Sequence, residues 1–350
     1  MTPRYGALVI SLDFELHWGV RHTTPPDGPY RRNLLGVWEA VPKMLTLFEE
    51  YDVAATWATV GFLFAKSRQE LEEFSPPVKP SYENHVLYPY DEPIGEDEAD
   101  DPLHFAPSLI EAIRRSPRQE LATHTFSHYF CLEPGQTREA FKADLDSALS
   151  IARENDVQIQ SIVFPRNQHN PDYDDLLINA GIVCYRTRQL AQTNSNTEVA
   201  EGTKLKPGLR PAAKLLARET RLKRRLRPVA GVLDYYVDLS GSHTVSWDSI
   251  RQDNGLCNIR GSFPIAPYSP RSKRFEALRI RRIVECVKRA AVSKEIFHIW
   301  WHPHNFGINV DQNIDFLRGV LQAFSRYRDS HGMRSMSMTD VAAAVRESYE

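Results

Sequence analysis

The chain is organised around Glu120-Leu-Ala-Thr-His-Thr-Phe-Ser-His-Tyr-Phe-Cys131, whose residues predict a strand that ends in two histidines. Its first residues alternate in polarity, which predicts a short strand over residues 119–123. If the chain turns helically after His124, that residue and His128 share a face, and both can bind one metal ion. Thr125 follows the first histidine, so this is not the His-Glu-x-x-His pattern of zinc proteases. Isolated pairs at this spacing are about as often surface turns without a chemical role, so the rest of the chain has to decide.

The composition is that of an ordinary globular protein, since 42% of the 350 residues are apolar and 25% are charged. The net charge of −2 provides no basic field that would favour nucleic acid. No run has the length of a membrane helix, and the N-terminal residues lack the apolar core of a signal peptide. The four cysteines have no paired spacing and are expected to be reduced, with Cys131 more often a buried small residue than a metal ligand. These features predict a cytoplasmic protein.

A second polar strand end lies near the N-terminus. Residues 7–13 form a continuous apolar run, as expected for a strand buried on both faces, and this run leads into Asp13-Phe-Glu15. Two carboxylates at the end of a buried strand are costly unless they are paired or bind a metal. The alternative is that Asp13 and Glu15 only cap a following turn.

Strand and helix patterns alternate along most of the chain, which predicts an α/β fold with parallel strands. Strands are expected over residues 52–59, 161–164 and 182–186. Helices are expected over residues 34–51, 137–155, 275–291 and 311–329, and a terminal helix is expected to begin with Thr339 as its cap.

Two stretches interrupt this alternation, at about residues 75–102 and 188–275. The first is rich in proline and acids, and it is expected to be either a lid or binding loop, or a solvated ornament. The second contains the basic run Lys214–Arg227, which could bind an anionic part of a substrate, although such runs are more often solvated helix faces. Both read as insertions rather than as linkers, so residues 1–350 are expected to form a single domain.

Two further strands are also followed by polar side chains. Arg166 comes after the strand over residues 161–164, where it could form a rim salt bridge or hold a catalytic carboxylate through two hydrogen bonds. His302 and His304 follow a late strand rich in tryptophan. The carboxyl ends of parallel strands form the active face of α/β folds. Acids, imidazoles and a guanidinium that meet there are the groups that metal-assisted hydrolysis of an amide or ester needs.

These strand ends form four ordered motifs: Leu12-Asp-Phe-Glu15, His124-Thr-Phe-Ser-His128, Phe164-Pro-Arg166 and Trp301-His-Pro-His304. The set resembles the polysaccharide deacetylase family, which is also described as the NodB-homology domain or carbohydrate esterase family 4. The histidine motif with its acidic partner is fairly specific, and the other two motifs are weaker. The resemblance implies a distorted, incomplete (β/α) barrel of about seven strands, interrupted by the two insertions.

The acidic motif departs from that of most family members, which have two adjacent acids. Here Phe14 separates Asp13 from Glu15. Because strand residues alternate, the two acids point to the same side and Phe14 points away. We therefore assign Glu15, His124 and His128 as metal ligands, and Asp13 as the base. Zinc suits two imidazoles and one carboxylate, and iron, cobalt and nickel are alternatives.

The resemblance implies a metal-dependent deacetylase that hydrolyses the N-acyl (acetamido) group of an amino sugar in a surface polysaccharide or its biosynthetic precursor. Asp13, oriented by Arg166, would take the proton of the attacking water. His302 would give a proton to the departing amine, with His304 as the reserve.

Aromatic residues beside the motifs are candidates for an apolar wall against the sugar ring or the acetyl methyl group. Tyr129 and Phe130 follow the histidine motif, and Trp300 and Trp301 precede the late histidines. At least one member of each neighbouring pair is expected to pack in the core. Tyr129 and Trp301, with His304, are taken as the substrate contacts.

Two other functions stay open on the sequence alone. One is a related metal-dependent amide hydrolase with a non-sugar substrate, of the allantoinase-like kind. The other is a catalytically inactive relative that binds sugar, although such a protein does not need all of these acids, histidines and the arginine. The expected partner is a carbohydrate, linked to a nucleotide or a lipid if the enzyme is cytoplasmic, and not a nucleic acid.

Overall fold

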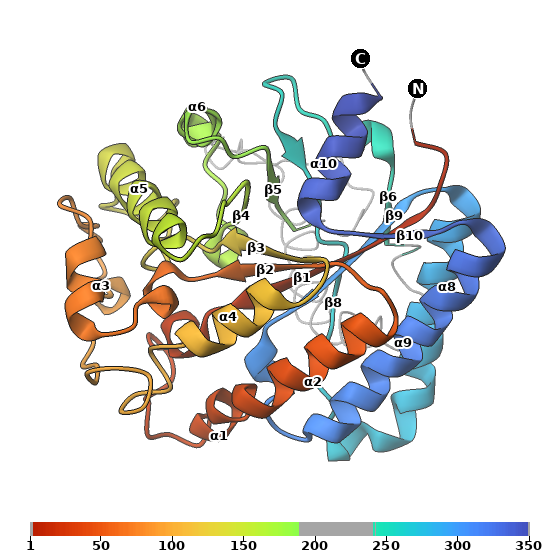
Figure 1. The fold of residues 1–350 in the computed structure, drawn as a ribbon, viewed down its shortest axis with the longest axis horizontal. Coiled ribbons are helices and arrows are strands. Elements are labelled where there is room, and N and C mark those ends of the chain that lie inside the picture. The colour runs from red at the N-terminus through yellow and green to blue at the C-terminus, as the bar shows by residue number, and fades with distance from the viewer. Residues whose placement is uncertain (1–2, 189–240, 242, 349–350) are drawn as a thin grey trace, which may run out of the picture.

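The computed structural model describes residues 3–188, 241 and 243–348, and it contains one curved sheet flanked by helices (Figure 1). The α/β class and the incomplete barrel are thereby confirmed. The strands are β1 (Ala7–Phe14), β2 (Ala55–Thr59), β3 (Gln119–Thr123), β4 (Ser161–Val163), β5 (Cys184–Arg186), β6 (Thr244–Val245), β7 (Cys257–Asn258), β8 (Phe263–Pro264), β9 (Ile296–Trp301) and β10 (Arg334–Met336). The sheet has ten strands in the part that is described, rather than about seven, because the two-residue strands β6, β7 and β8 give no sequence signal.

The strand order is β6-β9-β1-β2-β3-β4-β5-β7, with β10 beside β1 and β8 beside β9. All of these neighbours are parallel except β6, which runs antiparallel to β9. The carboxyl ends of the central strands therefore meet at one rim of the barrel. Each strand that carries a predicted site motif belongs to this central group.

A helix is present at each of the five places where the sequence analysis expects one, and the structure also has shorter helices. They are α1 (Arg31–Leu35), α2 (Val37–Glu50), α3 (Arg68–Phe74), α4 (Pro107–Arg115), α5 (Arg138–Glu154), α6 (Asp174–Asn179), α8 (Glu276–Ser293), α9 (Val310–His331) and α10 (Met338–Glu347). The cap of α10 is Ser337, two residues before Thr339, because Ser337 and Asp340 form a reciprocal capping box. Among the described helices, none combines the length and the apolar character that crossing a membrane requires.

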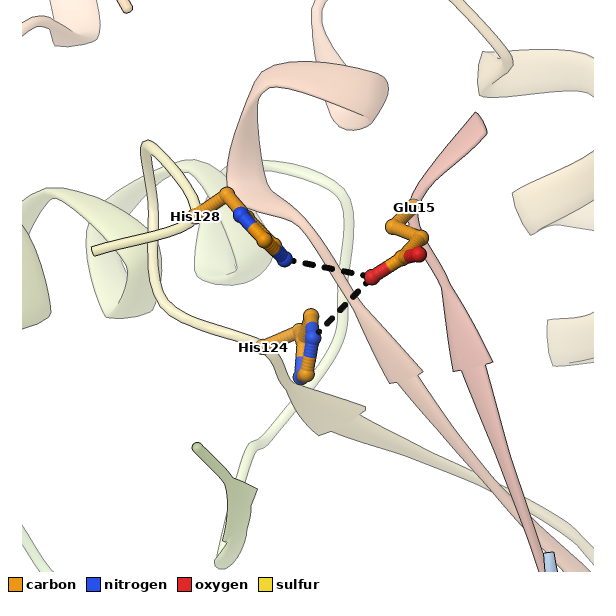
Figure 2. Close-up of side chains that lie close together, drawn as sticks. All are labelled: Glu15, His124 and His128. Carbon is orange, nitrogen blue, oxygen red and sulfur yellow. Dashed lines mark hydrogen bonds and ion pairs between the residues drawn. The ribbon is translucent and has the colours of Figure 1, made fainter. Parts of the chain in front are cut away.

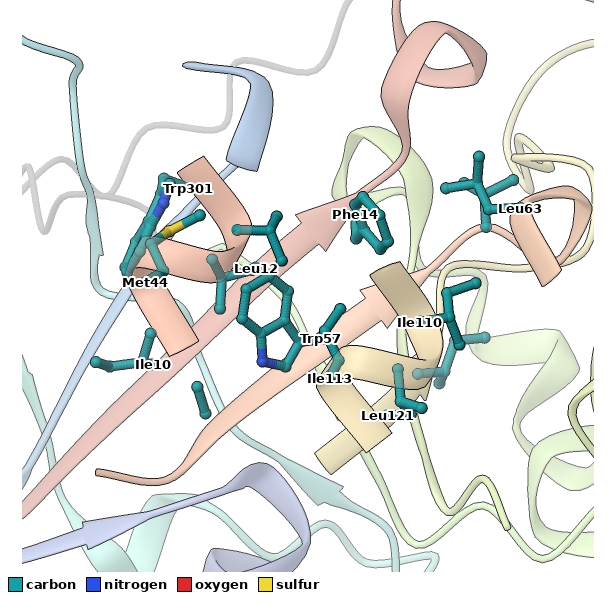
Figure 3. Packing of buried hydrophobic residues seen from close by; sticks show 14 of the residues in the cluster. Ile10, Leu12, Phe14, Met44, Trp57, Leu63, Ile110, Ile113, Leu121 and Trp301 are labelled. Carbon is teal, nitrogen blue, oxygen red and sulfur yellow. The ribbon is translucent and has the colours of Figure 1, made fainter. Parts of the chain in front are cut away.

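Alternation along β1 separates an outer from an inner face. Leu8, Ile10, Leu12 and Phe14 lie in a large core cluster with residues of α2, α4, α5, α8 and α9 (Figure 3). This cluster, here called the outer core, also contains Trp301 of β9. Phe14 therefore points away from the inside of the barrel, as the alternation predicts.

The inner face of β1 is apolar at its start and polar at its end. Ala7 and Val9 lie in a second, smaller cluster with residues of α10. Ser11 and Asp13 follow on the same side of the strand, and both are buried. The polar residues of this inner face lead directly to the carboxyl rim.

The first insertion packs on the segments that follow β1 and β3. It contains one short 3-10 helix, η3 (His85–Leu87). The Arg21 guanidinium donates to the backbone carbonyls of residues 86–88, and the Phe130 N–H donates to the Tyr82 hydroxyl over 2.9 Å. The insertion is thus attached to both segments that carry site residues, while its role as a lid or binding loop stays a prediction.

The second insertion is described only in part. Residues 189–240, and with them the basic run Lys214–Arg227, lie outside the described residues. Downstream of them, β6, β7 and β8 join the sheet beside β9 and β5.

Candidate metal and catalytic centre

The three predicted metal ligands lie together at the carboxyl rim of the barrel (Figure 2). Glu15 Oε2 is 3.3 Å from His124 Nε2 and 3.2 Å from His128 Nε2. All three side chains are buried. A carboxylate between two imidazole nitrogens inside a protein is an arrangement that suits a bound cation.

His124 stands directly after β3 and is oriented by a backbone carbonyl. Its Nδ1 lies 2.7 Å from the carbonyl oxygen of Val163. A carbonyl only accepts hydrogen bonds, so Nδ1 carries the proton and the lone pair of Nε2 faces Glu15. Outer hydrogen bonds of this kind fix the ring of a metal-binding histidine.

His128 reaches the site from a tight turn with an unusual backbone. Thr125 has a φ of 66° and His128 a φ of 58°. Positive φ is rare for residues other than glycine, and rarest for a β-branched residue such as threonine. The Thr125 hydroxyl accepts from the Tyr129 N–H over 2.6 Å, so hydrogen bonds within the turn hold this conformation.

Asp144 of α5 anchors the same turn. Its buried carboxylate accepts from the N–H of Phe126 over 2.7 Å, from the N–H of Ser127 over 3.1 Å and from the Ser127 hydroxyl. Asp144 was not predicted as a site residue, although it is an acid on the apolar face of the helix predicted over residues 137–155.

The anchoring carboxylate predicts a pH dependence of stability. Burial raises the pKa of Asp144 from 3.8 to about 6. The folded state then binds this proton more tightly than the unfolded chain, so the stabilising contribution is fully present below pH 3.8 and is lost as the pH rises through about 6. Relative to Asp144→Asn, the wild type should gain on the order of 2 kcal/mol in free energy of unfolding between pH 6 and pH 4. Urea unfolding of both proteins across this range measures the gain, and parallel pH profiles would contradict the assignment.

Asp13 is held by a guanidinium that belongs to Arg186, the last residue of β5. Arg186 Nη1 donates to Asp13 Oδ1 and Nη2 donates to Asp13 Oδ2, each over 2.7 Å. Both side chains are buried. The Trp300 ring lies 4.6 Å from the guanidinium carbon. Gly261 allows this packing, since a Cβ there would lie 2.9 Å from the Trp300 ring.

The prediction that Arg166 orients Asp13 is therefore wrong. β4 ends at Val163, and Arg166 lies in the 3-10 turn η4 (Pro165–Asn167) with a φ of 53°, so it does not continue the strand. Its Nη1 donates to Glu133 Oε1 over 3.1 Å, and the side chain is 38% exposed. Arg186 was identifiable in principle, because it ends the strand predicted over residues 182–186.

Ser11 and His298 extend the hydrogen bonds behind this ion pair. Arg186 Nη1 donates to Ser11 Oγ over 2.8 Å, and Ser11 Oγ lies 2.8 Å from His298 Nε2. His298 Nδ1 is 3.1 Å from the Ile259 carbonyl, so Nδ1 carries the proton and Nε2 accepts from the Ser11 hydroxyl. Burial lowers the pKa of His298 to about 3, which keeps this ring neutral.

Opposing effects set the charge of the two acids. Burial alone would raise the pKa of Asp13, but Arg186 together with His124 and His302 outweighs it, and the pKa lies below its ordinary value. Burial would also raise the pKa of Glu15, but the surrounding imidazoles, His302 first, hold it well below its ordinary value. Burial lowers the pKa of His128 to about 4, so its ring is neutral. Ionised carboxylates and neutral imidazoles are the forms that bind metal ions.

His302 lies beside both acids and reaches solvent. Its Nε2 is 3.7 Å from Asp13 Oδ2 and 3.6 Å from Glu15 Oε1, and its side chain is 29% exposed. His304 stacks on it with ring centroids 5.1 Å apart, but His304 is only 3% exposed. Burial lowers the pKa of His304 to about 3. Of the two late histidines, His302 has the position of a proton donor, and the predicted role of His304 as a substrate contact conflicts with its burial.

The prediction that Tyr129 contacts the substrate is wrong. Tyr129 is buried in the outer core, and its hydroxyl donates to Gln136 Oε1 and to the Thr137 carbonyl over 3.1 and 3.0 Å. Its neighbour Phe130 is the member of the pair that lies against the site, with its ring 5.0 Å from that of His128.

The prediction for Trp301 is wrong for a similar reason. In the parallel register of β9 and β1, Trp301 is opposite Leu12, and both lie in the outer core. Trp301 stacks on Phe306 with ring centroids 5.3 Å apart. Trp300 is opposite Ser11 and faces the inside, 6.0 Å from the ring of His302.

The donor set fits a divalent metal ion of the zinc type. Ligand atoms around a tetrahedral zinc lie roughly 3.3 Å apart, given bond lengths of about 2.0–2.2 Å. The two separations from Glu15 Oε2 are 3.2 and 3.3 Å, and the remaining one is below 4.8 Å. Two nitrogens and one carboxylate also suit iron, cobalt or nickel.

Comparisons with known proteins concern the fold. No protein-family model matches the sequence, and no curated protein matches it significantly. A structure described as a proposed polysaccharide deacetylase from Mycobacterium smegmatis is 13% identical, covers 99% of this chain and 92% of its own, and has a TM-score of 0.56. A proposed polysaccharide deacetylase from Pseudomonas aeruginosa PAO1 is 10% identical, with coverages of 97% and 91% and a TM-score of 0.47. A family 4 carbohydrate esterase from Streptomyces lividans in complex with acetate is 9% identical, with coverages of 96% and 93% and a TM-score of 0.37.

The first of these likenesses extends over nearly the whole length of both chains. At 13% identity it bears on the arrangement of strands and helices, and the chemistry has to be argued from the residues of the site. The chain therefore has the fold of the polysaccharide deacetylases, as its four motifs imply.

Proposed function

We propose that this protein is a metal-dependent deacetylase that hydrolyses the N-acyl (acetamido) group of an amino sugar in a surface polysaccharide or its biosynthetic precursor. The supporting observation is that three parts lie together at one rim. These are the Glu15 centre with its two histidines, the buried Asp13–Arg186 ion pair, and His302 within 3.7 Å of both acids. A metal site, an oriented base and an imidazole acid are what metal-assisted amide hydrolysis requires.

The base is Asp13. Glu15, His124 and His128 would hold a divalent ion, which when bound supplies a Lewis acid for the acyl carbonyl and makes water more acidic. Asp13 accepts the proton of the attacking water. Arg186 holds both oxygens of the Asp13 carboxylate, which fixes its orientation and keeps it ionised.

The acid is His302, which donates a proton to the nitrogen as the carbon–nitrogen bond breaks. The products are acetate and a free amine. Its partial exposure places His302 where a substrate can reach it, and Trp300 lies beside it. A protein that only binds sugar needs neither an oriented base nor a proton donor, so the complete set favours an enzyme.

A hydrolysis assay over a panel of substrates tests this function. The panel holds neutral acetamido sugars and their oligomers, nucleotide-linked and lipid-linked acetamido sugars, and cyclic ureides as non-sugar amides. We expect acetate to be released from acetamido sugars in equal amount to new amine. Turnover of the ureides alone would contradict the proposal that the substrate is a sugar. If zinc-loaded protein turned over no member of the panel, the proposal that the protein is an enzyme would be contradicted.

The metal centre makes a separate prediction about metal content. His128→Asn should lose one equivalent of bound metal per chain, because the shorter side chain cannot bring a nitrogen to the Glu15 oxygen. Asparagine tolerates the positive φ at this position, so the turn is preserved. Elemental analysis after dialysis measures the loss, and His331→Ala, at an exposed histidine of α9, is the control. Unchanged metal content in His128→Asn would contradict the ligand assignment.

A further inference from the structure

A second group of metal-ligand side chains lies where the first insertion meets the segment after β1. His17 belongs to the 3-10 helix η1 (Leu16–Gly19), Glu92 to the insertion, and His104 to the segment between the insertion and α4. His17 Nδ1 is 2.9 Å from His104 Nε2 and 3.6 Å from Glu92 Oε1. The imidazoles are buried, and the Glu92 side chain is 16% exposed. None of the three residues belongs to the Glu15 centre.

In each imidazole, one ring nitrogen has a hydrogen-bond partner outside the group, and this partner determines which nitrogen carries the proton. His17 Nε2 lies 2.9 Å from the carbonyl oxygen of Thr24, which only accepts, so Nε2 carries the proton. His104 Nδ1 lies 2.7 Å from Asp101 Oδ2. A carboxylate oxygen accepts hydrogen bonds, so His104 Nδ1 carries the proton.

Two lone pairs consequently face each other inside the protein. The free nitrogens are His17 Nδ1 and His104 Nε2, and two lone pairs at 2.9 Å repel unless a cation lies between or beside them. The cation is either a shared proton or a metal ion. Glu92 adds an acidic oxygen on the same side, with all three donor atoms within 4.8 Å of one another.

We propose that His17, His104 and Glu92 form a second binding site for a divalent cation of the zinc type. Two imidazoles and one carboxylate are a zinc ligand set, and a water completes the tetrahedron. The two nitrogens need to separate by only a few tenths of an ångström to reach the roughly 3.3 Å of tetrahedral ligands. The Thr24 carbonyl and the Asp101 carboxylate are the outer partners that orient metal-binding histidines.

The site joins the insertion to the segment that carries Glu15. The segment that follows the insertion already contacts η1 through two hydrogen bonds, from the His17 N–H to the Leu103 carbonyl over 3.2 Å and from Trp18 Nε1 to the His104 carbonyl over 3.0 Å. A metal ion there would tie the insertion to η1 without taking part in the chemistry at the Glu15 centre.

The test separates the two sites by removing the first. In the variant His124→Ala/His128→Asn, any specific ion left should belong to the second site. We expect one equivalent of zinc per chain after dialysis, with nitrogen and oxygen but no sulfur neighbours in its X-ray absorption spectrum. Adding Glu92→Ala should weaken zinc binding about 10- to 100-fold or more, since even outer-shell changes cost this much. Glu92 is partly exposed, so this variant is expected to fold.

A histidine of the same insertion supplies the matched control. His85 is exposed, so His85→Ala in the same background should keep the zinc equivalent that His104→Ala loses. The proposal is overturned if the background variant binds no zinc, or if Glu92→Ala and His104→Ala bind it as the His85 control does. Either result would mean that a shared proton separates the two rings. This test needs no substrate, so it stands or falls independently of the deacetylase activity.

Discussion

Asp13→Asn should keep its metal and lose turnover by roughly 10²-fold or more, because asparagine cannot accept the proton of the attacking water. Glu15→Gln should instead lose its metal ion, since the amide binds a cation much more weakly than the carboxylate does. Each substitution changes a carboxylate to an amide of the same size. Metal content by elemental analysis and kcat on the best substrate of the panel separate the two roles.

The two acids serve as controls for each other. They lie two residues apart, both are buried, and His302 Nε2 is within 3.7 Å of each. Melting temperatures of both variants show whether a loss of turnover reflects unfolding. If Asp13→Asn loses the metal while Glu15→Gln retains it, the base and the ligand have been exchanged.

Arg186→Met should lower kcat/KM by about 10²-fold or more at neutral pH, because it leaves the Asp13 carboxylate buried without its partner. The guanidinium lowers the pKa of Asp13, so its removal should raise that pKa. The acid limb of the pH–rate profile should therefore move to higher pH. A pH–rate profile distinguishes this positioning role from a merely structural one, which would lower activity without moving the limb.

Arg166→Met is the matched control. The family resemblance assigned the orientation of Asp13 to Arg166. The Arg166 guanidinium instead binds Glu133 and packs over the Phe130 ring 4.4 Å away. We expect the acid limb of the pH–rate profile of Arg166→Met to coincide with that of the wild type. Arg186→Lys should fall between the wild type and Arg186→Met, because lysine keeps the charge but cannot donate to both carboxylate oxygens in one plane. A shifted limb in Arg166→Met and an unshifted one in Arg186→Met would restore the original assignment.

The residues that could be predicted from the sequence are those whose signal is local. Asp13 and Glu15 stand out because carboxylates rarely end a buried strand, and His124 and His128 because they are four positions apart directly after a strand. Helices such as α5 follow from their own periodicity and from the cap at Thr137. In each case the prediction depends only on a few neighbouring residues.

The residues that were missed depend on pairing between distant segments. Whether Trp300 or Trp301 faces the site depends on the register of β9 against β1, which neither strand specifies alone. Arg166 follows a short strand and Arg186 ends another, and only the turn that begins at Pro165 shows that Arg166 leaves the sheet. His17 and His104 are 87 residues apart, and the folded insertion brings them together.

Reconstitution of the metal-free protein tests whether hydrolysis depends on a metal ion at the Glu15 centre. Protein freed of metal by a chelator would be titrated with zinc, iron, cobalt and nickel, and acetate release from an acetamido sugar would be followed at each step. We predict no release from the metal-free wild type, recovery of release on addition of a suitable ion, and no recovery in His128→Asn under the same conditions. Acetate release by the metal-free wild type at the rate of the reconstituted protein would contradict a metal-dependent deacetylase centred on Glu15, His124 and His128.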